Sequence, residues 1–493
     1  MYYISTRDKE KKVSGAFAIV SGISEDGGLY VPEYIPKLEK KDFDRLLEMD
    51  YCERAAFIMG KFLPEFSFDE LRACAQKAYS RFDGDPAPLV KIDKKMYILE
   101  LWHGPTHAFK DMALTLLPHL LLLCKRKLGI DTETVILTAT SGDTGKAALE
   151  GFKDVKGTRI CVFYPSEGVS NMQKLQMTTQ EGDNVCVYGI KGNFDDCQSA
   201  VKSVFADSEV IEEMKKRRCA MSSANSINWG RLLPQIVYYV SAYLDLVGEE
   251  QLFDGERINF CVPTGNFGNI LAAYYARQMG VPIEKLICAS NSNNVLTDFF
   301  TKGEYNIKRP FFKTISPSMD ILISSNLERL LFYASEMDDK LTAERMRLLK
   351  AEGRYAITEE EQKELSRVFY AGFSDEDDTI ETIQDFFEDY NYPLDPHTGV
   401  AVSVYDKYVE QTDSKTKSAI VSTASPYKFP QDVLFSITGD FCGDSFRSMK
   451  KLYKETALEI PSDLLGLKSK PQLYRQVIQA DEIKGVVLKF IGA

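Results

Sequence analysis

The feature that most constrains the fold is an alternation of short β-rich runs with longer helical stretches between residues 91 and 290. In the helical stretches, apolar residues recur at the spacing of one helix face. The strand–helix pairs fall at 96–99 and 112–128, 134–137 and 145–152, 159–163 and 171–179, 185–190 and 196–205, and 258–262 and 269–279, with a further helix at 232–244 and a strand at 286–289. This order predicts a parallel sheet with helices on both faces, in which ligands collect where strands end and helices begin.

The rest of the chain divides into segments of different character. Residues 1–90 carry helix patterns at 43–49 and 68–80, and we expect them to form a small amino-terminal domain. Residues 299–391 are more helical and end in the acidic run SDEDDTIETIQDFFED, which we interpret as a solvated helix face. Strands are predicted at 419–422 and 485–490. With 493 residues, the chain is long enough for two or three domains.

Composition and charge exclude several classes of partner. The chain has 44% hydrophobic and 27% charged residues, as globular proteins do. Its 72 acidic and 60 basic residues give a net charge of -12, which argues against nucleic-acid and anionic-membrane partners but leaves room for a small anionic ligand. The longest mostly apolar run, 114–124, is far shorter than the ~20 residues of a membrane span.

The cysteines, histidines and amino terminus indicate the cellular setting. The ten cysteines include no CxxC pair, so we expect free, mostly buried thiols and no zinc site. Only four histidines are present, which argues against a histidine metal site, and no metal is expected. The amino-terminal MYYISTRDKEKK has charges where a signal peptide has its apolar core, which favours a cytoplasmic protein.

The first stretch with chemical meaning is HGPTHAFKD, residues 103–111. Its Lys110 follows a Gly-Pro turn and opens an apolar helix. Lysine is rarely placed away from water without a task, and a desolvated lysine at a strand–helix junction can form a Schiff base. On this segment alone, a surface lysine at the start of a helix fits equally well.

Two glycine loops follow strands and open helices: TATSGDTGKAA at 138–148 and VPTGNFGNIL at 262–271. Backbone N–H groups at such helix starts suit a phosphate or carboxylate. Neither loop matches GxGxxG or GxxxxGK[ST], so a dinucleotide site and a P-loop are not supported. A plain turn explains either loop alone, but two loops on separate units favour an anion site.

The stretch SANSINWGR, residues 223–231, offers a second anion grip. Arg231 supplies a charged clamp, and Asn225 and Ser226 supply neutral donors, which together suit a second phosphate. A turn that caps a helix would look similar.

Taken together, the motifs resemble those of the threonine synthase family. HGPTHAFKD, SGDTG, NSIN, PTGNFGN, SPSMDI, DPHTG and STASPYKFP occur in that family's order, preceded by STRD and DGGLYVP. The likeness runs from about residue 3 to residue 429. It implies a pyridoxal-phosphate enzyme of fold type II. The expected α/β fold is a two-lobed parallel-sheet core over 91–450 with the helical insertion at 299–391, a small amino-terminal domain over 1–90, and a carboxyl-terminal segment, 451–493, packed on the core.

The resemblance also implies roles for matched positions. Lys110 would join the pyridoxal 5'-phosphate covalently, and Thr423 would face its pyridine nitrogen. The cofactor phosphate would be held by Gly265, Asn266, Phe267, Gly268 and Asn269. The substrate would be bound by Thr140, Ser141, Asp143, Thr144, Asn225, Ser226 and Arg231, the first four toward its carboxylate and the cofactor ring oxygen, the last three at its phosphate. His107, Lys146 and Ser425 depart from the residues usual in similar sequences, which bears on substrate detail more than on the cofactor.

The implied reaction converts O-phospho-L-homoserine and water to L-threonine and phosphate, with Lys110 as proton shuttle. A lyase that releases a 2-oxo acid, ammonia and phosphate would use the same lysine. A non-catalytic binding protein is a third reading, which Lys110 and both glycine loops oppose. The expected assembly is a monomer or homodimer whose partner is the small-molecule substrate.

Overall fold

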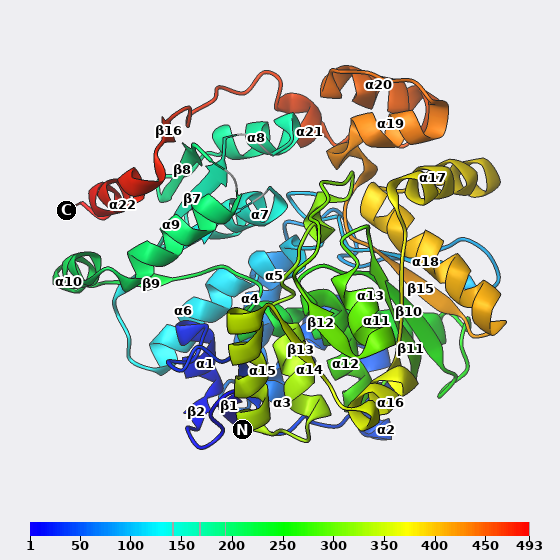
Figure 1. The fold of residues 1–493 in the computed structure, drawn as a ribbon, viewed down its shortest axis with the longest axis horizontal. Helices are drawn as coiled ribbons and strands as arrows, with labels where there is room; N and C mark the ends of the chain where they lie inside the picture. The colour runs from blue at the N-terminus through cyan, green and yellow to red at the C-terminus, as the bar shows by residue number, and fades with distance from the viewer. Residues whose placement is uncertain (141, 167–168, 193, 493) are drawn as a thin grey trace.

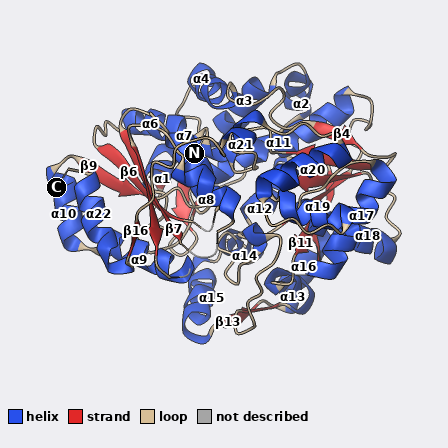
Figure 2. Ribbon diagram, turned by 90° about the horizontal axis from the view of Figure 1, so that it is seen from above, coloured by secondary structure: helices blue, strands red, loops and turns tan. Residues whose placement is uncertain are grey.

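Two β-sheets lie side by side in the structure, a computed structural model that describes residues 1–140, 142–166, 169–192 and 194–492 (Figures 1 and 2). The first sheet has the order β16-β8-β7-β6-β9, and each pair of neighbours is parallel. Its strands are β6 (Glu133–Ala139), β7 (Thr158–Pro165), β8 (Val185–Ile190), β9 (Cys219–Ser222) and β16 (Val477–Ile478). The second has the order β14-β11-β10-β15-β5-β4, in which β4 alone runs antiparallel to its neighbour. Its strands are β4 (Leu89–Lys91), β5 (Met96–Glu100), β10 (Ile258–Pro263), β11 (Ile283–Ser290), β14 (Phe369–Phe373) and β15 (Ser418–Ser422).

Helices cover both faces of each sheet, because the strands are apolar on both sides. In β6, Ile136 faces the main core and the next residue, Leu137, faces a separate cluster, as the two-residue period of a strand requires. The helices on the Leu137 face are α9 (Phe194–Ala206), α10 (Ser208–Lys216) and α22 (Ile483–Phe490), and those on the Ile136 side are α5 (Asp111–Leu114), α6 (Leu117–Lys127), α7 (Asp143–Phe152) and α8 (Asn171–Thr178). The second sheet lies between α11 (Trp229–Gly248) and α12 (Gly268–Met279) on one face and α17 (Glu376–Tyr390) and α18 (Pro396–Thr412) on the other. The predicted parallel-sheet α/β core is thus confirmed.

The amino-terminal segment packs directly on the core. Its elements are β1 (Tyr2–Ser5), β2 (Val13–Ser14), β3 (Tyr30–Pro32), α1 (Gly15–Ser21), α2 (Lys40–Leu47), α3 (Tyr51–Phe62) and α4 (Phe68–Tyr79). The Tyr3 ring lies edge-on to Trp229 of α11 with centroids 5.4 Å apart, and Asn228, which caps α11, donates to the Ile19 carbonyl at 3.1 Å. One hydrophobic cluster therefore continues from this segment into α11.

The helical insertion and the carboxyl-terminal region complete the chain. The insertion contains α13 (Val295–Lys302), β12 (Glu304–Asn306), η1 (Pro317–Met319), α14 (Leu327–Ala334), α15 (Asp339–Glu352), β13 (Arg354–Ala356) and α16 (Glu359–Val368). After β15 follow η2 (Pro426–Lys428), α19 (Pro430–Thr438), α20 (Ser445–Thr456), α21 (Ser462–Gly466) and η3 (Ala480–Glu482). The acidic run forms α17, which buries Ile383 and Phe386 and leaves most of its acidic side chains toward solvent.

Two expectations about elements were wrong. Residues 485–490, predicted as a strand, lie in helix α22. Ile483, Val487 and Ile491 recur every four residues and are buried together against α9 and α10, which is a helical rather than a strand period. The single helix predicted over 112–128 is interrupted between α5 and α6, because the ring of Pro118 cannot be accommodated over the Leu114 carbonyl in a continuous helix.

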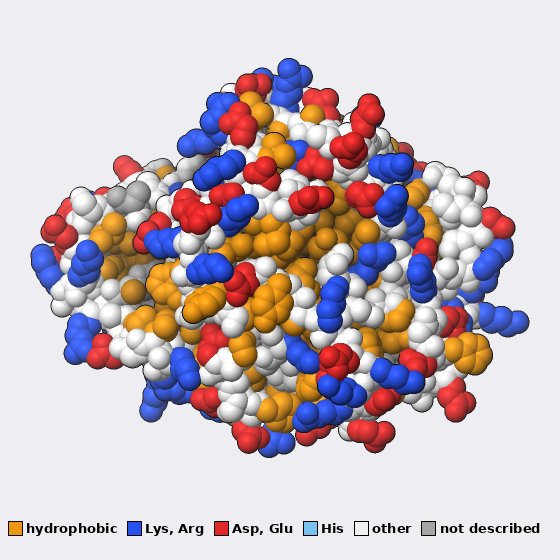
Figure 3. Space-filling model, turned by 90° about the horizontal axis from the view of Figure 1, so that it is seen from below, with side chains coloured by type: hydrophobic (Ala, Val, Ile, Leu, Met, Phe, Trp, Pro, Cys, Tyr) orange, Lys and Arg blue, Asp and Glu red, His pale blue; other side chains and the backbone are white. Residues whose placement is uncertain are grey.

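The surface and the thiols bear on the expected partners. All ten cysteines are free, and eight of them are buried. Among the described residues, the structure contains no helix long and apolar enough to cross a membrane. On the face shown in Figure 3, hydrophobic side chains gather in a band across the middle, and charged side chains of both signs are interspersed around it.

Candidate active site

Lys110 lies where the ends of β5 and β15 meet. The loop that follows β5 passes His107, whose φ of 56° is in the left-handed region, and forms an isolated bridge between Ala108 and Ala424. The Phe109 N–H then donates to the Thr423 carbonyl at 2.8 Å, and α5 begins after Lys110. The lysine side chain is only 11% exposed. The structure therefore removes this amine from water at a strand–helix junction.

Two polar groups reach the Lys110 amine. The Ser318 Oγ lies 3.2 Å from its Nζ, and the Asp143 Oδ2 lies 3.6 Å from it. Burial lowers the pKa of Lys110, and the positive charges of Lys428 and Arg231 lower it further, against the opposing effect of Asp143. An amine with a lowered pKa is available as a nucleophile and proton carrier.

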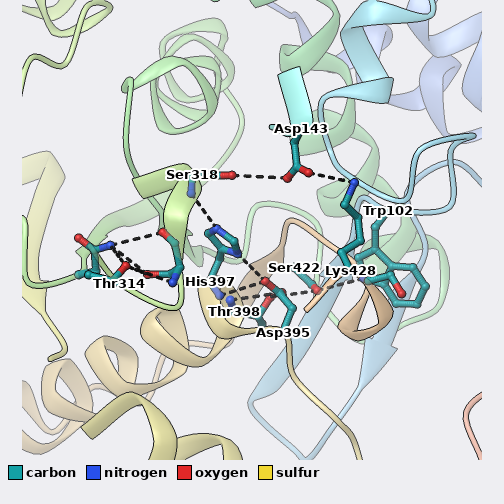
Figure 4. Close-up of polar contacts among 12 residues, drawn as sticks. Trp102, Asp143, Thr314, Ser318, Asp395, His397, Thr398, Ser422 and Lys428 are labelled. Carbon is teal, nitrogen blue, oxygen red and sulfur yellow. Dashed lines mark hydrogen bonds and ion pairs between the residues drawn. The ribbon is translucent and has the colours of Figure 1, made fainter. Parts of the chain in front are cut away.

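Asp143, the first residue of α7, is a buried carboxylate with two cationic neighbours, Lys110 and Lys428, the second of which is drawn in Figure 4. Its Oδ1 lies 2.9 Å from the Lys428 Nζ and accepts from Gln173 Nε2 at 3.2 Å. Burial alone would raise the pKa of Asp143, but Lys428 and Lys110 outweigh burial and hold that pKa well below its usual value. Because this side chain is an anion, it repels a carboxylate, and the donors of this loop that suit a carboxylate are its backbone N–H groups and hydroxyls.

Ser318 is held from the opposite side by a histidine. The Ser318 N–H donates to His397 Nε2 at 3.1 Å, while His397 Nδ1 lies 2.8 Å from Asp395 Oδ1 (Figure 4). Since Nε2 accepts, the ring proton is on Nδ1 and is donated to Asp395, so the imidazole is neutral. His397 and Asp395 belong to the first turn and cap of α18. They fix the 317–319 turn, and with it the hydroxyl beside Lys110.

The glycine loop before α12 presents free backbone donors. In the part of the chain that the structure describes, none of the N–H groups of residues 265–269 donates a hydrogen bond. Phe267 has a φ of 61°, and a Cβ built on Gly265 would lie 2.7 Å from the Ser318 carbonyl oxygen. The loop thus packs closely against the 317–319 turn. Its N–H groups lie at the start of α12, a position that favours binding of an anion. The side chain of Asn269 accepts from Tyr238 and Tyr239 and keeps a buried, unpartnered Nδ2.

The 223–231 segment lies beside this loop and contains a buried, under-satisfied cation. Arg231 is 4% exposed, its NH1 donates to the Ala224 carbonyl at 2.6 Å, and its Nε has no partner in the part of the chain that the structure describes. Among the described residues no carboxylate pairs with it, and burial lowers its pKa to about 10. Ser226 lies against Asn326, which also donates to the Asn266 carbonyl, whereas the Asn225 side chain is exposed.

The remaining residues named from the sequence are distributed as follows. The Thr140 hydroxyl accepts from the N–H groups of Gly142 and Gly145 at 3.0 and 2.9 Å, so it shapes the loop. Thr144 lies in the first turn of α7, and Ser141 lies outside the described residues. Thr423 is buried at the end of β15, beside the Lys110 loop.

The residues that sequence reasoning missed come from segments far apart in the chain. Lys428 and Ser318 lie in motifs that carried the resemblance, but no spacing pattern joins them to Lys110 or Asp143. Arg329 of α14 is fully buried, and it donates to Asn326, to the Ile227 carbonyl at 2.6 Å and to the Tyr30 carbonyl at 3.0 Å. The available signal was Lys428, which follows the strand pattern at 419–422 and lies between Tyr427 and Phe429; a lysine in such a setting argues for a buried charge that needs a partner.

These features fit one cofactor. A nucleophilic lysine, a helix start with free N–H groups and a neutral hydroxyl, Thr423, at a strand end are what a phosphate-bearing pyridine aldehyde requires. Residues 83–360 match the family described as "Pyridoxal-phosphate dependent enzyme", and residues 2–79 match "Threonine synthase N terminus". The class that fold and site define is therefore that of the pyridoxal-phosphate-dependent enzymes.

Individual relatives place the chain within this class. It is 38% identical over 437 residues to a threonine synthase of Pseudomonas aeruginosa, covering 88% of this chain and 90% of that protein. A pyridoxal-phosphate-bound threonine synthase of Brucella melitensis superimposes with a TM-score of 0.88 at 35% identity over the full length of both chains. The yeast threonine synthase superimposes with a TM-score of 0.88 at 32% identity, covering 100% of this chain and 99% of that one. The chain belongs to the threonine synthase family.

A second group of relatives is longer. The human protein named threonine synthase-like 1 is 40% identical over 445 residues, a match that covers 86% of this chain and 59% of that protein. The corresponding mouse protein is 37% identical over 502 residues and is covered to 66%. The chain thus spans about 60% of the length of the human relative.

Proposed function

We propose that this protein is a threonine synthase, which converts O-phospho-L-homoserine and water to L-threonine and phosphate. The observation that carries the proposal is that two buried cationic side chains, Lys110 and Arg231, occur at the site. Arg231 lacks a carboxylate partner among the described residues. A cationic side chain without a carboxylate partner, near a reactive amine, suits a substrate whose leaving group is a phosphate. Relatives of Pseudomonas aeruginosa, Brucella melitensis and yeast that bear this name support it.

In this proposal the chain's own residues divide the work. Pyridoxal 5'-phosphate, when bound, supplies an electron sink for the negative charge left by removal of the α- and β-protons. The N–H groups of residues 265–269 hold its phosphate, Thr423 faces its ring nitrogen, and Lys110 is its attachment point. Thr423 has no negative charge to stabilise a protonated ring nitrogen, so that nitrogen would stay neutral.

Proton transfer falls to the Lys110 amine. It is a suitable carrier because burial and neighbouring cations lower its pKa, while Asp143 and Ser318 keep its position. Arg231 and the neutral donors of Asn225 and Ser226 bind the substrate phosphate and retain it when it leaves. The backbone N–H groups of Asp143 and Thr144, at the start of α7, are placed for the substrate carboxylate.

The proposal also covers the cellular location and the assembly of the protein. Free, mostly buried thiols suit the reducing cytoplasm, where we place the protein as a monomer or homodimer.

The direct test is to incubate the purified, cofactor-loaded protein with O-phospho-L-homoserine and to quantify threonine, 2-oxobutanoate and phosphate. Threonine and phosphate in equal amounts are expected. Equal amounts of 2-oxobutanoate and phosphate without threonine would replace the proposal by a lyase reaction, and no product would exclude this substrate.

A further inference from the structure

The carboxylate of Asp143 is shared unequally between Lys110 and Lys428, the second of which is drawn in Figure 4. Its Oδ1 faces Lys428 at 2.9 Å and also accepts from Gln173. Its Oδ2 faces Lys110 at 3.6 Å and Ser318 Oγ at 3.5 Å. Each oxygen thus serves a different ammonium, and the shorter contact belongs to Lys428.

The two ammonium groups differ in how fully they are satisfied. The Lys428 side chain is 0% exposed, and its three N–H donors have three acceptors: Asp143 Oδ1, the Thr106 carbonyl at 3.0 Å and Gln176 Oε1 at 3.0 Å. In the part of the chain that the structure describes, the Lys110 ammonium makes one hydrogen bond, to Ser318 Oγ, and approaches Asp143 Oδ2 at 3.6 Å. Loss of a proton therefore costs least at Lys110, because there the fewest hydrogen bonds of the charged form are lost.

The other charges around Lys110 either favour loss of its proton or are already paired. Arg231 of α11 adds positive charge, and Asp111 of α5 is engaged by the N–H and hydroxyl of Thr106. His397 of α18 is neutral and paired with Asp395. Among the described residues, Asp143 of α7 is the carboxylate that favours the protonated form of Lys110.

We propose that Lys428 is a positioning residue: it acts as the permanent counter-ion of Asp143 and thereby leaves the Lys110 amine free to lose its proton and join the cofactor. This inference rests on the proposed attachment of the cofactor to Lys110. The ammonium first releases a proton to solvent. The neutral amine and the aldehyde then exchange C=O for C=N, and the aldehyde oxygen leaves with the two amine hydrogens as one water. Without Lys428, Asp143 would pair with Lys110 alone and keep it protonated.

The test measures cofactor capture against pH. Pyridoxal 5'-phosphate is added to full-length protein from which cofactor has been dialysed, and the rate at which the visible absorption band appears is recorded from pH 6 to 10. In Lys428→Met the midpoint of the profile is expected to move up by about one pH unit or more, the usual effect of giving a carboxylate wholly to one neighbouring cation. Lys428→Arg keeps the positive charge, so its midpoint is expected to lie close to the wild-type value.

A matched control separates this effect from the loss of any buried lysine. Lys146 lies on the same helix as Asp143 and pairs instead with Glu150 at 3.0 Å and Gln180 at 2.5 Å. Lys146→Met is expected to keep the wild-type midpoint. A folded Lys428→Met with the wild-type midpoint would overturn the inference, as would an equal shift in Lys146→Met.

Lys428→Met leaves a buried carboxylate short of a partner and can fail to fold, which thermal unfolding would reveal. The double variant Asp143→Asn/Lys428→Met removes both charges and decides that case. Its midpoint is expected below that of the wild type, because burial then acts on Lys110 without Asp143; a midpoint at or above the wild-type value would contradict the inference.

Lys110→Ala distinguishes the two levels of the argument. If this variant still gains the band at the normal rate, the proposed attachment fails and this inference fails with it. If it gains no band and Lys428→Met behaves as wild type, only the role of Lys428 is wrong.

Discussion

At the scale of single residues, two unpaired polar atoms lie at the site. The Nε of Arg231 and the Nδ2 of Asn269 are buried without partners among the described residues. Burying a charge or an amide in this way costs free energy unless a ligand supplies the missing acceptor. Arg231 and the 265–269 loop could be named from the sequence, because their residue types at a helix start limit what they can do. Lys428 and Ser318 could not, since their importance depends on which distant segment they meet.

Removal of the Arg231 charge should weaken binding of the substrate more than binding of the cofactor. In Arg231→Met we expect the KM for O-phospho-L-homoserine to rise by about 10- to 100-fold, the equivalent of losing one charge-assisted hydrogen bond of about 1.5–3 kcal/mol. Steady-state kinetics measure this effect, and inhibition by inorganic phosphate should weaken in parallel. An unchanged KM, or a loss of the visible cofactor band instead, would assign Arg231 a different role.

At the scale of elements, the site is assembled by helix starts and strand ends. α7 and α12 both begin at the carboxyl ends of parallel strands, β6 and β10, as the alternation of patterns predicts. The predicted strand at 485–490 was wrong because a short apolar run fits both periods. Only the tertiary partners of Ile483 and Val487, on α9 and α10, select the helix.

The close approach of Gly265 to the 317–319 turn gives a test at this scale. A methyl group in Gly265→Ala would meet the Ser318 carbonyl oxygen at 2.7 Å, so the loop must shift away from the helix start. We expect the Kd for pyridoxal 5'-phosphate to rise at least 10-fold, measured by fluorescence titration. Gly485→Ala in α22, where a Cβ meets no atom within 4 Å, is the control and should bind normally. Equal affinity of the two variants would mean that the loop does not hold the phosphate.

A buried ion pair along α7 predicts acid sensitivity. Burial alone would raise the pKa of Glu150, but Lys146 and Arg81 outweigh it and lower that pKa to about 2, below an unfolded value of about 4.5. The stabilisation is therefore complete above about pH 5 and is lost as pH falls toward 2. Because Arg81 is 36% exposed, we expect a contribution of on the order of 2 kcal/mol.

Thermal unfolding of wild type and Glu150→Gln at several pH values measures this contribution. The wild type should melt higher at pH 7, and the difference should shrink steadily below pH 5. A difference that is constant with pH would show that the charge of Glu150 does not contribute.

At the scale of the whole molecule, the sequence was sufficient for the sheet architecture and the family but not for the way the segments join. The sequence predicts a small domain over residues 1–90, and the packing of Tyr3 on Trp229 joins this segment to the helix that carries Arg231. Such contacts join residues far apart in the chain, and period and spacing carry no information about them. In the proposed function, the fold delivers one buried amine, Lys110, to a cofactor held by the 265–269 loop.

The measurement that tests this claim most directly is borohydride reduction of the cofactor-loaded protein, followed by proteolysis and mass spectrometry of the modified peptide. The account predicts a single stable adduct, located on Lys110 and absent from Lys110→Ala. An adduct on another lysine, or full loading with cofactor and no adduct at all, would contradict it.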